Sequence, residues 1–267
     1  MAQVQLKDFK MHYLERGTGS EPIIFVHGFI STQVWWQLTL EQLPASFRAY
    51  AIDLRACGES ECIETNHTLA QYADDLHQFV EQMGLQQFIL VGHSMGGGIA
   101  MQYALNHQDR LKALVLVDPM AAYGTRVSPE ITAWINAQQG NAEGISQLIL
   151  GAFATPPKGA YLEKLVEDGV LWDKPIYLGT MDDMAGFNIS DRLPEIHVPT
   201  LLTWGDKDTV IPFAAIVDIF TKIPGCALEV WHGVGHSGPI EIPERFVALL
   251  TSFVDEADLA TRAAQTN

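Results

Sequence analysis

Apolar residues in this chain form short unbroken runs that are separated by segments of helical periodicity. Six such runs lie at residues 23–26, 49–53, 88–91, 113–117, 200–204 and 227–231. Runs of this length and composition are typical of strands buried on both faces of a parallel sheet. Near the amino terminus, residues 4–6 and 10–14 instead predict a hairpin that glycines close.

The segments between these runs carry apolar residues at helical spacing. Thr68 precedes such a segment and can cap it, and Gly84 ends it, which predicts a helix over 69–83. Further helices are expected at 34–43, 94–107 and 242–255. Strands that alternate with helices predict an α/β fold with a doubly wound, mostly parallel sheet. Right-handed crossovers place the carboxyl ends of the strands at one edge, where such folds carry their sites.

One long segment interrupts the alternation. Residues 119–194 contain no clear buried strand, but hold several aromatic residues among short helical stretches. We therefore expect a helical lid at 119–194, inserted into a core made of residues 1–118 and 195–267. The tail that follows Asp255 has no apolar pattern and is expected to be frayed.

A sharp turn that could expose a nucleophile lies between a predicted strand and a predicted helix. The sequence Gly92-His93-Ser94-Met95-Gly96 fits the G-x-S-x-G pattern in the context that this pattern requires. Side chains at the two glycines would collide with the neighbouring strand and helix. The turn would lift the Ser94 hydroxyl above the sheet at the positive end of a helix.

A serine hydroxyl needs a base, and His236 is the histidine best placed to serve as one. It lies in a glycine-rich loop directly after the last predicted strand, and such a loop can reach across the edge of the sheet. Other histidines lie on helices or in loops without such a setting, namely His67, His77, His107 and His197.

The base in turn needs a carboxylate that fixes its tautomer and stabilises its protonated form. Two aspartates follow the strand 200–204. Asp206 is expected to cap the turn, whereas Asp208 lies further out and can point back over the edge. Asp118, at the end of another strand, is the alternative. Asp208 gives the chain order Ser, Asp, His that the elbow predicts.

Two backbone N–H groups are expected to stabilise the oxyanion of a tetrahedral intermediate. One belongs to Met95, the residue after the proposed nucleophile, and the other to Phe29, in the turn after the strand 23–26. Gly28 allows that turn to be tight. This chemistry requires neither a metal nor a cofactor.

Charge and cysteine content narrow the range of partners. Lys and Arg number 16 and Asp and Glu number 32, so the formal net charge is −16. Such a surface repels phosphate backbones and anionic lipid, which argues against nucleic-acid binding. No stretch approaches the ~18 apolar residues of a membrane span. The amino terminus lacks the pattern of a signal peptide, so we expect a cytoplasmic protein. Three cysteines do not form a disulfide framework, although Cys57 and Cys62 are close enough to bond.

Several motifs together resemble the α/β-hydrolase superfamily over nearly the whole chain, from Ile23 to about Asp255. The matching segments are HGF at 27–29, DLRACGES at 53–60, GHSMGGG at 92–98, TWGDKDTVIP at 203–212 and GVGHSGPIEIPE at 233–244. The resemblance implies the same nucleophile, acid, base and oxyanion donors as the reasoning above: Ser94, Asp208, His236, Phe29 and Met95. One segment departs from the family, because Ala56 replaces the first glycine of D-x-R-G-x-G-x-S and Cys57 follows it.

These features predict a serine hydrolase that cleaves an ester or lactone of a small to medium apolar substrate through an acyl-enzyme. The substrate pocket is expected to include Trp35, Met120, Trp134 and Trp172. Carbon–carbon bond hydrolysis, acyl transfer, peracid formation and a receptor that keeps the triad remain alternatives, because a fold does not fix a substrate. The sequence leaves the oligomeric state open.

Overall fold

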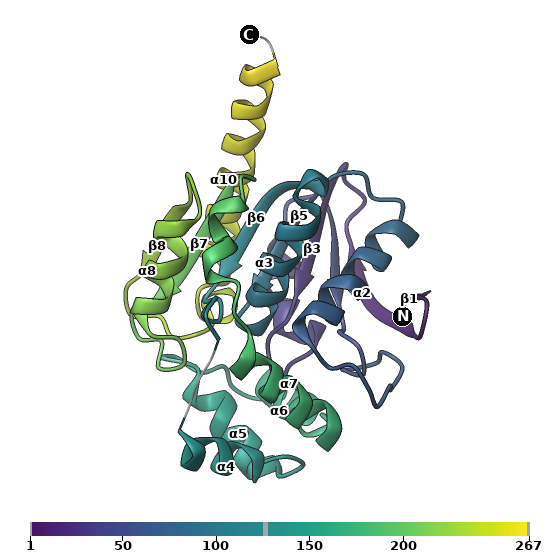
Figure 1. Cartoon of the computed structure of the whole chain (residues 1–267), viewed down its shortest axis with the longest axis vertical. Coiled ribbons are helices and arrows are strands. Elements are labelled where there is room, and N and C mark those ends of the chain that lie inside the picture. Colours follow the sequence, from purple (N-terminus) through teal and green to yellow (C-terminus); the bar gives the residue numbers. More distant parts are fainter. Residues whose placement is uncertain (1, 125–127, 266–267) are drawn as a thin grey trace.

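An eight-stranded sheet forms the centre of the computed structural model, which describes residues 2–124 and 128–265 (Figure 1). Its strands are β1 (Ala2–Gln5), β2 (Lys10–Arg16), β3 (Glu21–Val26), β4 (Phe47–Ile52), β5 (Phe88–His93), β6 (Leu111–Val117), β7 (Thr200–Gly205) and β8 (Ala227–Trp231). They lie side by side in the order β1-β2-β4-β3-β5-β6-β7-β8. The expected hairpin and all six expected runs are strands of this sheet.

The direction of the strands confirms a doubly wound, mostly parallel sheet. β1 and β2 pair antiparallel, as do β2 and β4, and every other neighbouring pair is parallel. The chain runs from β3 outward to β4, and then returns to β5 on the other side of β3. The strand order therefore reverses between β3 and β5, and crevices for ligands form at the carboxyl ends of strands at such a point.

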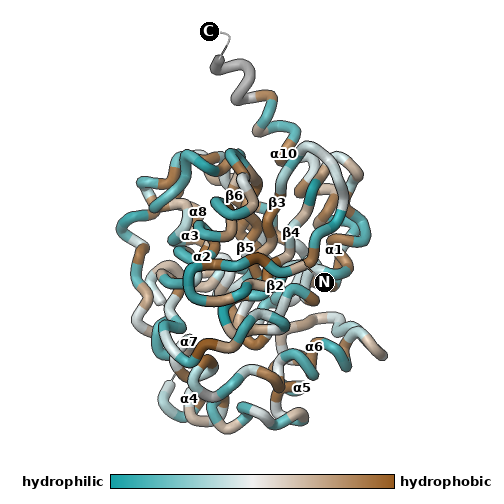
Figure 2. The backbone as a smooth tube through the Cα atoms, turned by 90° about the vertical axis from the view of Figure 1, so that its right-hand side faces the viewer, coloured by the Kyte–Doolittle hydropathy of each residue, from teal (hydrophilic) through white to brown (hydrophobic). Residues whose placement is uncertain are grey.

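Helices cover both faces of the sheet. They are α1 (Gln37–Gln42), α2 (Leu69–Gln82), α3 (Met95–His107), α8 (Phe213–Lys222), α9 (Gly238–Glu241) and α10 (Pro243–Gln265), with 3₁₀ turns η1 (Gln33–Trp36), η2 (Gln108–Arg110) and η3 (Ser190–Glu195). Figure 1 shows α2, α3 and α8 on the face towards the viewer, and α1 contacts α10 on the other. In Figure 2, hydrophobic segments concentrate in the strands between these layers, as buried parallel strands require.

Between β6 and β7, where we expected no strand, the described residues form four α-helices ahead of η3. They are α4 (Pro129–Asn136), α5 (Ala142–Gly151), α6 (Ala160–Val170) and α7 (Lys174–Gly186), and we call them the inserted helices. They lie together below one end of the sheet in Figure 1. The division into a core and a lid at 118/119 and 194/195 remains a proposal.

Two helix predictions need correction. The expected helix at 34–43 consists of η1 followed by the short α1. The prediction of a frayed tail after Asp255 is wrong, because α10 continues to Gln265. Its buried side chains recur at helical spacing as far as Ala257, beyond the end that we assigned from the sequence. Helix α8 was not predicted at all.

The loop after β4, where the sequence departs from the family pattern, keeps a left-handed turn. Ala56 has φ 58° and Gly58 has φ 55°, so alanine here adopts a conformation that costs a residue with a Cβ about 1–2 kcal/mol. A Cβ at Gly58 would lie 2.5 Å from the Asp53 carboxylate. That carboxylate accepts hydrogen bonds from the Glu59 N–H at 3.1 Å and, across the loop after β3, from the Gln33 N–H at 2.8 Å.

All three cysteines are free thiols, so Cys57 and Cys62 are not bonded to each other. Within residues 2–124 and 128–265, no helix combines the length and the apolar character that a membrane crossing demands.

Candidate active site

Ser94 occupies the turn between β5 and α3, in a backbone conformation that few residues other than glycine adopt. Its φ is 54° and its ψ is −118°. Conformations of this kind cost about 1–3 kcal/mol and persist where the surrounding structure imposes them. The Ser94 N–H donates to the Val117 carbonyl at 3.0 Å, and the Ser94 carbonyl accepts from the Met120 N–H at 3.0 Å. The turn is therefore anchored to the end of β6.

The glycines on either side of Ser94 make this turn possible. A Cβ at Gly92 would lie 2.2 Å from the Gly96 carbonyl oxygen, and a Cβ at Gly96 would lie 2.4 Å from the Val26 carbonyl oxygen. Both distances are far inside van der Waals contact. Any larger residue at either position would push the strand, the helix or β3 apart, which explains why the G-x-S-x-G spacing is needed.

His236 and Asp208 form a buried hydrogen-bonded pair. The His236 Nδ1 lies 2.8 Å from Asp208 Oδ2. The other carboxylate oxygen, Oδ1, accepts from the N–H groups of Val210 at 2.7 Å and Ile211 at 2.9 Å. These donors stabilise the charged carboxylate, which then holds the proton of His236 on Nδ1 and leaves Nε2 as the basic nitrogen.

The loop that carries His236 is held against the residue that precedes Ser94. The His93 Nε2–H donates to the His236 carbonyl at 2.7 Å, and the His236 N–H donates to the Ala152 carbonyl at 2.7 Å. Burial and the neighbouring His236 hold the pKa of His93 well below its usual range, so His93 is neutral. A Cβ at Gly205 would lie 2.2 Å from the Gly235 carbonyl oxygen, which shows how closely the loop passes the end of β7.

Two acidic residues fix the shape of this loop, and the sequence indicated neither of them in that role. Asp206, which we expected to cap its own turn after β7, instead accepts from the Gly233 N–H in the loop after β8 at 2.7 Å. Glu241 accepts from the Gly235 N–H at 2.8 Å and from the Thr155 N–H at 2.7 Å, so it joins the loop to the segment after α5. Glu241 lies in the stretch 233–244, but nothing in its spacing predicted these partners.

Asp118, the alternative acid, lies close to the same imidazole. Its Oδ1 accepts from the Gly205 N–H at 2.9 Å, and its Oδ2 is buried without a hydrogen-bond partner among the described residues. Atoms of Asp118, Asp208 and His236 that could bind a metal all lie within 4.8 Å of one another. Burial, with the repulsion of Asp208, raises the pKa of Asp118 to about 8. Asp118 is thus mainly protonated at neutral pH, which leaves Asp208 as the charged partner of His236.

The pKa of His236 predicts the acid side of the pH profile. Burial lowers the pKa of this imidazole, but the charge of Asp208 and its hydrogen bond outweigh burial and raise the pKa above 6.5. Only the neutral imidazole can take the Ser94 proton. We expect kcat/KM for a neutral ester to fall as pH decreases, with a midpoint above 6.5. Initial rates from about pH 5 to about pH 9 measure that midpoint; one clearly below 6.5 would contradict the pairing with Asp208.

The expected oxyanion donors flank the serine. Met95 is the first residue of α3, where the backbone N–H has no partner within the helix. The turn after β3 lies directly against Ser94, because a Cβ at Gly28 would lie 3.1 Å from the Ser94 Cβ. Phe29 follows Gly28 and lines the same cavity as Ser94.

A cavity of about 390 Å³ lies between the inserted helices and the carboxyl ends of the strands. Its lining residues are Gly28, Phe29, Ile30, Ser31, Trp35, His93, Ser94, Met120, Ile131, Ile135, Leu148, Ile149, Ala152, Met181, Met184, Thr209, Val210, Ile211 and His236. The cavity therefore brings Ser94 and His236 to one wall and places aliphatic side chains of the inserted helices opposite them.

Two of the four expected pocket residues lie elsewhere. Trp35 and Met120 line the cavity. Trp134 is 47% exposed on the outer side of α4, and Trp172 is buried behind Phe29, with ring centroids 5.1 Å apart. The aromatic content of the segment indicated an apolar pocket, but it did not show which side of each helix faces inward.

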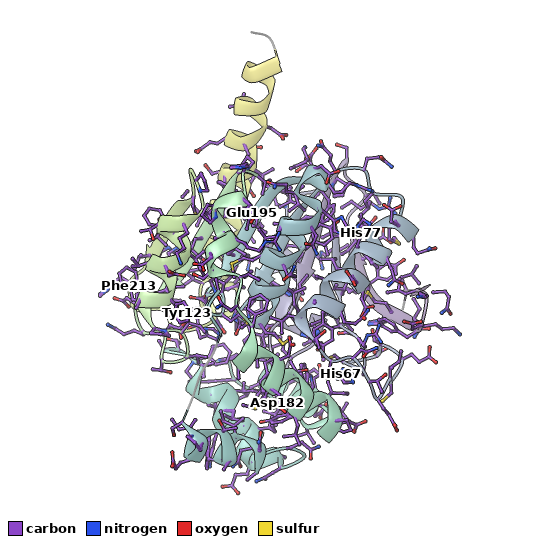
Figure 3. All side chains as sticks on the ribbon, in the orientation of Figure 1. His67, His77, Tyr123, Asp182, Glu195 and Phe213 are labelled. Carbon is purple, nitrogen blue, oxygen red and sulfur yellow. The ribbon has the colours of Figure 1, made fainter. Side chains whose placement is uncertain are left out.

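The four histidines that we set aside from the sequence serve other contacts. His67 hydrogen-bonds the Tyr72 hydroxyl at 3.3 Å, and His77 stacks on His107 with ring centroids 3.8 Å apart. Figure 3 labels His67 and His77, both on the side of the molecule that α2 forms. His197 donates its backbone N–H to Gln108 at the surface. None of them lines the cavity.

Comparison with known proteins shows which family has this architecture. The sequence model of the alpha/beta hydrolase fold matches residues 21–178. A dihydrolipoyllysine-residue acetyltransferase component of the acetoin cleaving system from Cupriavidus necator is 29% identical over 252 residues, which cover 90% of this chain and 65% of the relative. The chain thus spans about two thirds of that protein's length.

Solved structures agree with this match over almost the whole chain. An esterase from Exiguobacterium antarcticum superposes with a TM-score of 0.88 at 25% identity, covering 95% of this chain and 98% of the esterase. Est816, described as an N-acyl homoserine lactone degrading enzyme, gives 0.80 at 28% identity, covering 94% and 100%. The chain belongs to the alpha/beta hydrolase fold family.

Proposed function

We propose that the protein is a serine hydrolase that cleaves carboxylic esters or lactones of small to medium, uncharged, apolar substrates. One observation carries the proposal: Ser94, in its strained turn, lines the same cavity as His236, and the His236 imidazole is hydrogen-bonded to Asp208 at 2.8 Å. A serine with such a base and such an acid is the arrangement that activates a hydroxyl for acyl transfer.

The reaction would proceed in two steps at these residues. The Ser94 oxygen attacks the substrate carbonyl while the Nε2 of His236 takes its proton, and the N–H groups of Phe29 and Met95 stabilise the oxyanion. His236 then gives the proton to the leaving alcohol, and an acyl-enzyme forms. Water, deprotonated by the same imidazole, releases the acid and restores Ser94.

The cavity lining supports uncharged substrates. Among the described residues that line it, the ionisable side chains are the two histidines, and neither lysine nor arginine is present. His93 is neutral and His236 is the base, so no lining side chain within residues 2–124 and 128–265 offers a fixed positive charge to a substrate carboxylate. The methionines of the lining, Met120, Met181 and Met184, can adapt to acyl chains of different shape.

The solved relatives support the same reaction class. One is named as an esterase and another as an enzyme that degrades N-acyl homoserine lactones, and both cover at least 94% of this chain. Ester and lactone cleavage use the same attack on a carbonyl carbon. The choice between an open ester and a ring remains part of the proposal.

A matched trio of esters tests the substrate class. We expect p-nitrophenyl pentanoate to be cleaved well, and a p-nitrophenyl monoester of glutaric acid to show kcat/KM at least about 100-fold lower, because its free carboxylate would be buried without a partner. The same glutarate capped as its methyl ester has no charge and should recover most of the rate. Initial rates for the three substrates measure the effect of charge at similar length.

Three other outcomes of these assays would contradict this function or favour a different one. Equal rates for the free and the capped glutarate esters would contradict an uncharged substrate class. A single stoichiometric burst of p-nitrophenol without turnover would instead favour a receptor, or a transferase that lacks its acceptor. Wild-type protein that cleaves no ester or lactone above the background of Ser94→Ala would overturn the hydrolase assignment itself.

A further inference from the structure

The loop after β3, which carries the Phe29 N–H, contains a strained residue. Ile30 has φ 49°, an unfavourable conformation for a β-branched side chain. An oxyanion donor must be held close to its productive position, since a misplacement of about 1 Å can cost about 100-fold in rate. Contacts from outside the loop must therefore fix its shape.

Helix α6 supplies one such contact through a buried carboxylate. The Thr32 hydroxyl donates to Asp168 Oδ2 at 2.7 Å, and both side chains are buried. The other carboxylate oxygen accepts from Lys164, one turn earlier in α6, at 2.7 Å. The same Thr32 oxygen accepts from the Val34 N–H at 3.2 Å and so caps η1. Asp168 thus holds the hydroxyl of Thr32, the last residue of the loop, in place.

The residues just before Thr32 contact the same part of the inserted helices. The Trp172 Nε1–H donates to the Ser31 carbonyl at 3.1 Å, and the Trp172 ring packs edge-on against Phe29. A Cβ at Gly169 would lie 3.2 Å from the Ile30 carbonyl oxygen, so α6 packs closely on the loop backbone. Each residue from Phe29 to Thr32 is therefore in contact with α6 or the turn that follows it.

We propose that Asp168 is a positioning residue, which acts through Thr32 to hold the loop at residues 29–32 so that the Phe29 N–H faces the substrate carbonyl oxygen. This inference rests on the proposed function for the role of that N–H. Asp168 and Thr32 are not among the residues that line the cavity, so neither contacts the substrate there. Their effect should therefore fall on the transition state and leave binding of the ester almost unchanged.

Thr32→Val tests the inference, because valine keeps the shape of threonine and removes its hydroxyl. We expect kcat for p-nitrophenyl pentanoate to fall about 10- to 100-fold, within the loss seen when one oxyanion donor is disturbed, while KM changes less than about threefold. Thr32→Ser, which keeps the hydroxyl, should retain kcat within about threefold. Asp168→Asn serves as a second variant, with a smaller loss of kcat because its amide oxygen can still accept from Thr32.

Thr180→Val is a matched control. The Thr180 hydroxyl pairs with the Tyr72 hydroxyl at 2.9 Å and joins α7 to α2, so this variant removes a buried hydrogen bond of the inserted helices in which no residue of the loop after β3 takes part. Thr180→Val should leave kcat near that of the wild type. If it lowers kcat as much as Thr32→Val does, packing of the inserted helices in general is responsible and the inference fails.

Hydrogen exchange separates this inference from the proposed function, because it needs no substrate. Amides in residues 27–36 should exchange about tenfold faster in Thr32→Val than in wild type or Thr180→Val. Unchanged exchange in that peptide would overturn the inference, whatever the activity. If the wild type cleaves no ester, the proposed function fails instead, and faster exchange would still show that the hydroxyl holds the loop.

Discussion

Ser94→Ala is expected to lower kcat/KM for a neutral ester by about 10⁵- to 10⁶-fold, the loss typical of removing the nucleophile of a triad. Without the hydroxyl no acyl-enzyme can form, and only the oxyanion donors and substrate binding remain. Burst and steady-state kinetics with p-nitrophenyl pentanoate would measure the loss. Both the burst and the turnover should disappear.

The fold should survive this change. Alanine occupies less space than serine and meets the same backbone strain at φ 54°, so the thermal midpoint should stay within a few degrees of wild type. Ser252→Ala, in α10, is a suitable control because its exposed hydroxyl hydrogen-bonds Glu256 of the same helix. A Ser94→Ala protein that is folded and still cleaves the ester would show that another residue is the nucleophile.

Asp208→Asn is expected to lower kcat by about 10⁴-fold, since an amide can hold His236 in the wrong tautomer and cannot stabilise its protonated form. Asp208 is the carboxylate to remove because it accepts both the His236 Nδ1–H and two backbone N–H groups. Steady-state kinetics at a pH above the His236 midpoint would measure kcat without the contribution of imidazole protonation.

Asp118→Asn provides the comparison, since both aspartates lie near the same imidazole. Asp118 is mainly protonated at neutral pH, because burial raises its pKa to about 8. Its replacement by the neutral, isosteric asparagine should therefore change kcat by less than about tenfold. The assignment of the acid would have to be reversed if Asp118→Asn lost far more activity than Asp208→Asn.

The sequence predicted the parts of the site that depend on strand ends. Ser94, Asp208, His236 and Phe29 each follow a strand of the parallel part of the sheet, and parallel strands bring such positions to one edge. Local spacing and one rule of topology were therefore enough to propose which side chains meet. The topology of the sheet also shows that Ser94 and the turn at Phe29 follow β5 and β3, the two strands between which the strand order reverses.

Contacts between distant segments could not be predicted in this way. The Thr32–Asp168 hydrogen bond joins residues 136 positions apart, and the His93–His236 bond joins residues 143 positions apart. Both partners in each pair look ordinary in the sequence, because a threonine after a loop or a histidine in a turn has many possible roles. Their roles appear only when the inserted helices and the loop after β8 are placed on the sheet.

Side-chain direction explains the errors in the pocket. Trp134 and Trp172 were chosen because large aromatics in a helical segment indicate an apolar interior. Trp134 lies on the exposed side of α4, and Trp172 lies in the turn after α6, behind Phe29, so aromatic content alone did not predict either position. The side chains that the inserted helices contribute to the cavity are instead aliphatic residues and methionines, such as Ile135 and Met184.

Covalent labelling by a fluorophosphonate tests the central claim, that the His236 imidazole activates the Ser94 hydroxyl. Wild-type protein should gain one phosphonyl group, and peptide mass spectrometry should locate it on Ser94. His236→Ala should label at least about 1000-fold more slowly, because serine is a weak nucleophile without its base. Folded wild-type protein that stays unlabelled, or a label on another residue, would contradict the account.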